Sequence, residues 1–187
     1  MNIMIKKEGM INMDRISEFY KVSYDQFKKD WLNTFSEPGD EKLREEQYIM
    51  DTYDSLEKPV RATAGSAGYD FYSPLDFVLE PGEEILFPTG MKAKMGEEWV
   101  LLIFPRSSLG FKYFTMLNNT VGVVDATYYN NVDNEGHMFV KLHNCGNKPL
   151  VVNKGDRVCQ GIFMRYGITV DDNVTTERSG GFGSTGR

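Results

Sequence analysis

The chain has 187 residues, of which 41% are hydrophobic and 26% are charged, the proportions of an ordinary globular protein. This length fits one domain, or one domain with an appendage. The formal net charge of −6 at pH 7 argues against a broad nucleic-acid binder, which normally carries a basic face, although a few arginines and a metal ion can still hold a phosphate ligand.

Residues 14–57 are predicted to be helical. Ser23 is the expected N-cap of the first helix, with Gln26 three residues later in a capping-box pattern. Four aromatic side chains recur at steps of three and four residues: Tyr24, Phe27, Trp31 and Phe35. Such a stripe usually faces a core, so we expect it to pack on the rest of the protein. A surface for a protein partner is the alternative.

A second helix is predicted after a break. Pro38 and Gly39 are expected to end the first helix, and Asp40 to cap the second. Side chains of mixed polarity follow at helical steps: Leu43, Gln47, Met50 and Asp54. A helical pair this short cannot bury much apolar surface by itself, which again predicts docking onto the remaining chain.

From about residue 61 the helical period disappears, and short β-rich runs alternate with Gly and Pro. These runs are Ile85–Phe87, Trp99–Phe104, Val121–Val124, His137–Leu142, Leu150–Val152 and Val158–Met164. Short strands separated by turn signals predict an all-β sandwich or barrel. Trp99–Phe104 is apolar throughout, as expected for a strand covered on both sides, whereas His137–Leu142 alternates between two faces.

Other features concern the surroundings of the protein. No run approaches about 18 uninterrupted apolar residues, so no membrane span is expected, and the start of the chain lacks the apolar core of a signal peptide. Cys145 and Cys159 are the only cysteines, too few for a disulfide framework, which predicts a reducing, cytoplasmic location.

Two clusters suit metal or phosphate chemistry. Asp70, beside a glycine at the start of a strand, can hold metal-bound waters, although a turn aspartate is the simpler interpretation of this residue alone. Arg106 follows the apolar run together with Ser107 and Ser108. The guanidinium and hydroxyls suit phosphate oxygens, and a helix beginning at either serine would add N–H groups facing an anion. A helix cap is the equal alternative.

A third cluster suits acid–base chemistry. Asp125 closes the apolar run Val121–Val124 and precedes Tyr128 by three residues. An aspartate at the mouth of a packed strand is a candidate general base. A turn aspartate that closes a hairpin is the alternative.

The fourth cluster occupies the last β-rich run. Val158, Gln160 and Ile162 are predicted to share one side of this strand, and a glutamine on a mostly apolar side suggests a specific hydrogen bond. Asp156 and Arg157 are interpreted as a structural pair. Cys159 is interpreted as a small buried hydrophobe.

The fifth cluster is the C-terminal segment 178–187. It places Arg178, Phe182 and three hydroxyl side chains on a scaffold with four glycines, and glycines let backbone N–H groups approach phosphates closely. The segment is predicted to be mobile unless a ligand or neighbour holds it. The alternative to a segment that contacts a phosphate ligand is a disordered end.

In this order and spacing, the five clusters resemble the five motifs of the homotrimeric dUTPase family. The resemblance covers about residues 59–187, and its most specific parts are NNTVGVVD (118–125) and GGFGSTG (180–186). It implies a mainly β fold, a distorted barrel or jelly roll. The predicted organisation is a helical N-terminal extension (1–58), a β domain (59–177) and a Gly-rich lid (178–187).

The resemblance also implies an activity, namely hydrolysis of dUTP to dUMP and pyrophosphate with Mg²⁺ as the cofactor. This reaction would limit uracil in DNA and supply dUMP for dTMP synthesis. The family works as a homotrimer whose three sites lie between subunits, and the C-terminal motif closes over the nucleotide. No nucleic-acid or membrane partner is expected, and a protein partner at the N-terminal helices is left open.

Residue roles follow from the same resemblance. Asp125 matches the carboxylate that activates the attacking water, and Asp70 matches the one that contacts Mg²⁺ through water. The residues that match substrate-binding positions are Arg106, Ser107, Ser108, Asn119, Gly122, Tyr128, Gln160, Arg178, Phe182, Gly183, Ser184 and Thr185. Among them, Asn119 matches the residue that recognises uracil, Tyr128 the ring under the deoxyribose, and Phe182 the ring that stacks on uracil.

Two motifs depart from the family pattern. Its third motif usually continues as Asp-Tyr-Arg-Gly, but Thr127 replaces the aspartate here, and Tyr129 and Asn130 replace the arginine and glycine. These changes affect the exit of the hairpin and any subunit contact that the lost charges would make. In the fourth motif, Gly161 stands where leucine is common and removes a packed side chain.

Two functions of other classes compete with dUTP hydrolysis. A dCTP deaminase, or a bifunctional enzyme on the same fold, would need a catalytic glutamate beside the base hairpin, and we find no matching motif. A nucleotide-regulated binding protein would use residues 1–58 as its contact surface.

Overall fold

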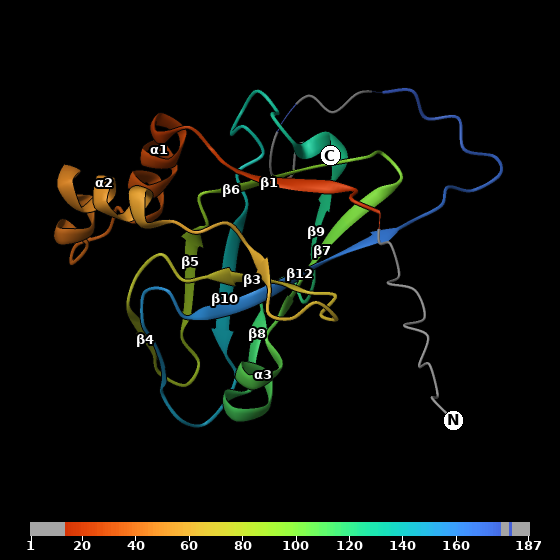
Figure 1. Cartoon of the computed structure of the whole chain (residues 1–187). Coiled ribbons are helices and arrows are strands. Elements are labelled where there is room, and N and C mark those ends of the chain that lie inside the picture. Colours follow the sequence, from red (N-terminus) through yellow and green to blue (C-terminus); the bar gives the residue numbers. More distant parts are fainter. Residues whose placement is uncertain (1–13, 177–179, 181–187) are drawn as a thin grey trace, which may run out of the picture.

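The computed structural model describes residues 14–176 and 180, and its elements are mainly strands (Figure 1). The strands are β1 (Ser17–Lys21), β2 (Val60–Arg61), β3 (Tyr69–Tyr72), β4 (Phe77–Leu79), β5 (Glu84–Pro88), β6 (Met91–Met95), β7 (Trp99–Pro105), β8 (Thr115–Leu117), β9 (Gly122–Asp125), β10 (Phe139–Asn144), β11 (Leu150–Val152) and β12 (Arg157–Arg165). The helices are α1 (Tyr24–Thr34), α2 (Glu46–Ser55) and α3 (Ser107–Tyr113), with 3₁₀ turns η1 (Glu41–Arg44) and η2 (Ala126–Tyr128). The predicted mainly β fold is confirmed.

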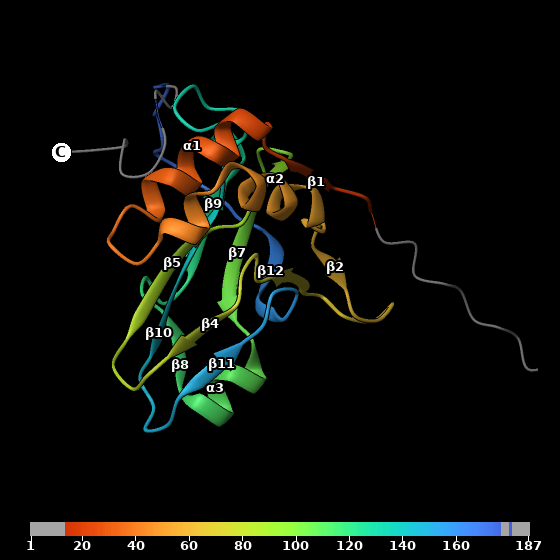
Figure 2. The same cartoon turned by 90° about the vertical axis from the view of Figure 1, so that its left-hand side faces the viewer.

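Among the described residues, the strands form four antiparallel sheets. The largest has the order β2-β3-β12-β7-β9, the second has the order β5-β10-β8, and β1-β6 and β11-β4 form pairs. Antiparallel neighbours can be joined by short turns, which agrees with the Gly- and Pro-rich connections. Helices α1 and α2 lie together at one end of the sheets, and α3 lies at the other end (Figure 2).

The prediction that residues 14–57 are helical throughout is wrong at its start. Residues 17–21 form β1, whose Phe19 is buried and pairs with Ala93 of β6. Strand formation depends on cross-strand packing more than on local preference, so this pairing decides the conformation. Ser23 is the N-cap of α1 as predicted, and its hydroxyl oxygen accepts a 3.2 Å hydrogen bond from the backbone N–H of Gln26.

The predicted aromatic stripe of α1 packs into the core. Phe27 and Trp31 are fully buried, and Phe35 is 6% exposed. The indole N–H of Trp31 also donates a 2.8 Å hydrogen bond to the carbonyl of Leu43. These side chains join the β domain in one hydrophobic cluster, so helix α1 is an integral part of the fold.

The second helix differs from its prediction in two ways. Asp40 precedes η1 but makes no side-chain cap, because its carboxylate accepts a hydrogen bond from the backbone N–H of Glu37. Helix α2 starts later, at Glu46, and buries Ile49 and Thr52, whereas Met50 of the expected stripe is 40% exposed. The predicted cap and start of this helix are therefore wrong.

Strands β7 and β10 partly follow their predicted patterns. In β7, Leu101 and Ile103 are buried while Leu102 is half-buried, so one chain alone does not provide the two covered faces that were predicted. In β10, alternate residues are buried as predicted. His137 lies before this strand begins and is fully buried.

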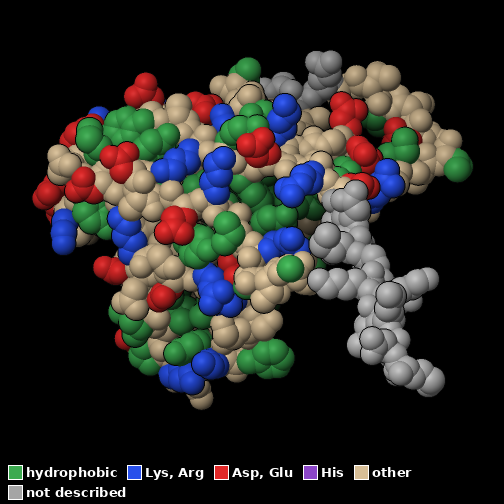
Figure 3. All heavy atoms as spheres, viewed as in Figure 1, with side chains coloured by type: hydrophobic (Ala, Val, Ile, Leu, Met, Phe, Trp, Pro, Cys, Tyr) green, Lys and Arg blue, Asp and Glu red, His purple; other side chains and the backbone are tan. Residues whose placement is uncertain are grey.

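The surface visible in Figure 3 mixes Lys and Arg with Asp and Glu and shows no large region of one sign. Within the described residues, no helix combines the length and apolar character needed to cross a membrane.

Candidate active site

A cavity of about 510 Å³ lies beside strands β8, β9 and β10, a volume in the range of small-molecule sites. It brings together four residues that were predicted from the third motif. These residues are Asn119, Gly122, Asp125 and Tyr128. Apolar side chains that include Phe71, Ile103 and Leu117 form much of the remaining lining, so the cavity offers an apolar body with a few polar groups at defined positions.

The turn between β8 and β9 presents one rim of this cavity. The carbonyl of Asn119 accepts 2.6 Å hydrogen bonds from the backbone N–H of Val121 and the hydroxyl of Thr120, which fix the turn while the Asn119 side chain is exposed. Gly122 lies against β7, because an added Cβ there would be 3.1 Å from the Cβ of Ile103. A side chain at this position would require Ile103 or the hairpin to shift by a few tenths of an ångström.

Asp125 and Tyr128 are held at the exit of this hairpin. Asp125 is the last residue of β9, pairs with Val100 of β7 and is partly exposed beside the cavity. Tyr128 is 7% exposed, and its hydroxyl donates a 2.9 Å hydrogen bond to the carbonyl of His137. The same hydroxyl accepts a 2.7 Å hydrogen bond from the side-chain amide of Asn134, so its position is fixed on two sides.

A second cluster surrounds Asp70 of β3, which is 7% exposed. Its Oδ1 lies 3.3 Å from Nε of Arg106, and its Oδ2 accepts a 3.2 Å hydrogen bond from Nη1 of Arg157. Gln160 pairs with Asp70 across β3 and β12. Two guanidinium groups around one carboxylate leave a net positive charge, which favours an anionic ligand.

Arg157 was missed as a member of this cluster, because it was assigned to a pair with Asp156. That assignment is wrong: Asp156 instead accepts a hydrogen bond from the backbone N–H of Asn153. The irregularity in β12 between Arg157 and Cys159 explains the difference, because a bulge redirects side chains. It also leaves both Val158 and Cys159 buried, so the predicted alternation is wrong at this point.

The prediction for Cys159 of β12 is confirmed. Cys159 is fully buried, and burial raises the pKa of its thiol, so it behaves as a small hydrophobe. Gly161 is closely packed: an added Cβ would lie 2.8 Å from Leu101 Cδ1 and 3.0 Å from Phe71 Cε2. Neighbouring side chains thus fill the space that a side chain at this position would need.

Ser107 is the first residue of α3, as the helix-start prediction requires. The N-cap is Arg106, whose carbonyl accepts the backbone N–H groups of Leu109 and Gly110. Neither serine is the cap, and both Ser107 and Ser108 are exposed. Both serines are therefore accessible to solvent, directly after Arg106 in the chain.

One chain does not place Asp125 beside Arg106. Asp125 pairs with Val100, near the start of β7, whereas Arg106 follows its last residue. At about 3.4 Å per residue, these positions are roughly 20 Å apart along the strand. The predicted lid residues Arg178, Phe182, Gly183, Ser184 and Thr185 lie outside the described residues.

The positions that depart from the expected third motif contact neighbouring strands. The ring of Tyr129 lies 5.9 Å from that of Tyr20 in β1, centroid to centroid. The side-chain carbonyl of Asn130 accepts a 2.8 Å hydrogen bond from Lys92 of β6. The altered hairpin exit therefore contacts both strands of the β1-β6 pair.

Mg²⁺, the cofactor that the resemblance implies, fits Asp70 as a contact through water. No group of three or more His, Cys, Asp or Glu side chains that could hold a metal occurs in the part of the chain that the structure describes. Each oxygen of the Asp70 carboxylate contacts one arginine, which leaves acceptor capacity for water. A Mg²⁺ ion that binds mainly to phosphate oxygens and water needs few protein ligands.

Fold and site together define a mainly β protein with a nucleoside-sized cavity and a separate arginine–carboxylate cluster. A family model described as dUTPase matches residues 54–186. The chain is 47% identical over 130 residues to the deoxyuridine 5'-triphosphate nucleotidohydrolase of Lactococcus lactis subsp. lactis, covering 68% of this chain and 87% of the relative. The chain belongs to the dUTPase family.

Solved structures agree with this assignment. The dUTPase from Streptococcus mutans is 42% identical, with a TM-score of 0.54 over 59% of this chain and 87% of that chain. A dUTPase of Staphylococcus bacteriophage 80alpha is 22% identical, with a TM-score of 0.54 over 71% of this chain and 93% of that chain. The latter likeness concerns the fold alone.

Proposed function

We propose that the chain hydrolyses dUTP to dUMP and pyrophosphate. The single observation that carries this proposal is the cavity that gathers Asn119, Gly122, Asp125 and Tyr128 in a chain that belongs to the dUTPase family. The physiological consequence would be less uracil in DNA and a supply of dUMP for dTMP synthesis.

The cavity residues would select the nucleoside. Uracil would lie at the turn, with its polar edge against the Asn119 amide and the backbone near Gly122. The deoxyribose would pack on the ring of Tyr128, which is fixed by hydrogen bonds at its hydroxyl. A ring held in this way leaves little room for a 2′-hydroxyl, so UTP would be a poor substrate.

Asp125 would be the general base. Its carboxylate would take a proton from a water molecule as the water oxygen attacks the α-phosphorus in line. The bond from the α-phosphorus to the bridging oxygen would break, and pyrophosphate would leave. This chemistry consists mainly of positioning and charge neutralisation.

The phosphates would bind to the arginine cluster. Arg106, Ser107, Ser108 and Gln160 are the proposed contacts, and Asp70 would orient water around Mg²⁺, an ion that neutralises phosphate charge when bound. Arg178, Ser184 and Thr185 would add contacts from the C-terminal motif, with Gly183 allowing close backbone approach and Phe182 stacking on uracil.

The proposed enzyme is a homotrimer with each site between copies. The separation of Asp125 from Arg106 along β7 supports this assembly, because one nucleotide needs both groups. The incompletely covered face of β7 and the 63% exposure of Val123 on neighbouring β9 also suit burial against another copy.

The substrate assignment can be tested by measuring pyrophosphate release from dUTP, UTP, dCTP and dTTP with Mg²⁺. We expect hydrolysis of dUTP at a kcat/KM at least about 100-fold above that of the others, because a tight polar site discriminates strongly against unmatched groups. Equal rates on UTP or dCTP would contradict the roles of Tyr128 and Asn119. Ammonia release from dCTP would instead support a deaminase.

A further inference from the structure

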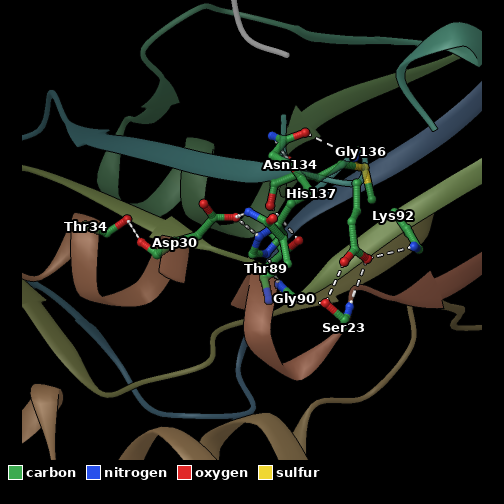
Figure 4. Close-up of polar contacts among 12 residues, drawn as sticks. Ser23, Asp30, Thr34, Thr89, Gly90, Lys92, Asn134, Gly136 and His137 are labelled. Carbon is green, nitrogen blue, oxygen red and sulfur yellow. Dashed lines mark hydrogen bonds and ion pairs between the residues drawn. The ribbon is translucent and has the colours of Figure 1, made fainter. Parts of the chain in front are cut away.

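The buried side chain of His137, which precedes β10, links helix α1 to a wall of the cavity. The imidazole is fully buried and is held on both sides (Figure 4). Its Nε2 accepts a 2.8 Å hydrogen bond from the backbone N–H of Gly90. A nitrogen that accepts carries no hydrogen, so a neutral His137 has its proton on Nδ1 and donates the 2.6 Å hydrogen bond to Oδ2 of Asp30.

The backbone of the same residue holds the cavity side chain Tyr128. The carbonyl of His137 accepts hydrogen bonds from the Tyr128 hydroxyl at 2.9 Å and from the Asn134 amide at 3.3 Å. The next two residues along the chain, Met138 and Phe139, line the cavity themselves. A displacement of His137 would therefore move both the tyrosine and the adjoining wall.

Asp30 is itself fixed by α1. Its residue exposure is 9%, and Oδ2 also accepts a 2.8 Å hydrogen bond from the Gln26 side chain, one turn earlier. The loop that contains His137 makes a second contact with the start of α1. The Ser23 hydroxyl donates a 2.5 Å hydrogen bond to Oε1 of Glu135 in this loop. Burial raises the pKa of Glu135, but hydrogen bonds from Ser23 and the Lys92 ammonium outweigh burial and lower the pKa to about 2.

We propose that Asp30 is a positioning residue for the nucleotide pocket: through His137 it sets the position of Tyr128 and so the discrimination between deoxyribose and ribose. This inference rests on the proposed function. It assigns a role in substrate selection to a helix that lies outside residues 54–186, the part matched by the family model. A small shift of a positioning group is enough to alter selectivity, because reacting geometries are narrow.

The test compares kcat and KM for dUTP and UTP in the full-length chain. Asp30→Ala is expected to lower the dUTP/UTP ratio of kcat/KM by about tenfold, mainly through a lower KM for UTP. Asp30→Asn, whose amide oxygen can still accept from His137, should restore most of the ratio. Trp31→Phe is the matched control, because it perturbs the core of α1 and removes the bond to Leu43 without touching His137.

Any one of four results would overturn the inference. One is a ratio in Asp30→Ala within about twofold of the wild type, and another is the same loss of ratio in Trp31→Phe. If Asp30→Ala does not fold, nitrogen NMR of the wild type decides, since the chain has only two histidines. We expect an Nδ1–H tautomer at His137 whose signals shift on binding of a non-hydrolysable dUTP analogue, with His143 as reference; the Nε2–H form or unchanged signals would contradict it.

The two proposals fail separately in this experiment. A wild-type chain that releases no pyrophosphate from dUTP contradicts the proposed function. A wild-type chain that is active on dUTP, with an unchanged ratio in Asp30→Ala, contradicts only the role of Asp30.

Discussion

Replacement of Asp125 by Asn is expected to lower kcat for dUTP hydrolysis by about 10²–10⁴-fold, the usual contribution of a positioned general base. An amide has the shape of the carboxylate but cannot take the proton of the attacking water. Nucleotide affinity should change little, because Asn119, Gly122 and Tyr128 still line the cavity. Steady-state kinetics and calorimetric titration with a non-hydrolysable analogue measure the two effects separately.

Asp51→Asn is the control for this variant. Asp51 is an exposed residue of α2 that accepts a hydrogen bond from Gln47, which an asparagine oxygen can also accept. Its kcat should equal that of the wild type. Retention of more than about a tenth of the wild-type kcat by Asp125→Asn would remove Asp125 from the mechanism.

Replacement of Trp31 by Ala is expected to lower the free energy of unfolding by about 3–5 kcal/mol, the range for deleting a large buried aromatic side chain. Trp31 is fully buried, packs against Phe27 and Phe35, and donates a hydrogen bond to Leu43. Guanidinium unfolding followed by the fluorescence of Trp99, the other tryptophan, measures the change.

Met50→Ala is the control for packing, because Met50 lies on α2 and is 40% exposed. Its cost should be within about 0.5 kcal/mol of zero, as for most surface substitutions. If Trp31→Ala cost no more than Met50→Ala, the N-terminal segment would not share the core of the β domain in solution.

Strands with a continuous apolar run could be predicted from the sequence, because their signal is local. Leu150–Val152 coincides with β11, and β7 and β12 each extend their predicted runs by one or two residues. β6 was missed although Met91 to Met95 alternates apolar with lysine residues, a period-two pattern that marks a half-buried strand. The alternation of β1 is weaker, and this strand forms because it pairs with β6.

Much of the candidate site depends on contacts that no local pattern encodes. Asp125 and Tyr128 were found from the motif that contains them, and the structure places both at the cavity. Arg157 reaches Asp70 only because β12 pairs with β3 across an irregularity. The bond between Asp30 and His137 joins residues 107 positions apart, and a buried histidine in an alternating segment gives no sign of its partner.

The central claim is that each site takes Asp125 from one copy and Arg106 from another. Co-expression of Asp125→Asn chains with Arg106→Ala chains tests it most directly, because each variant alone should be nearly inactive. If the sites lie between copies, randomly mixed oligomers should recover about a quarter of the wild-type dUTP hydrolysis. If both residues served the same site from one chain, the mixture would stay as inactive as its two parents, and that result would contradict the account.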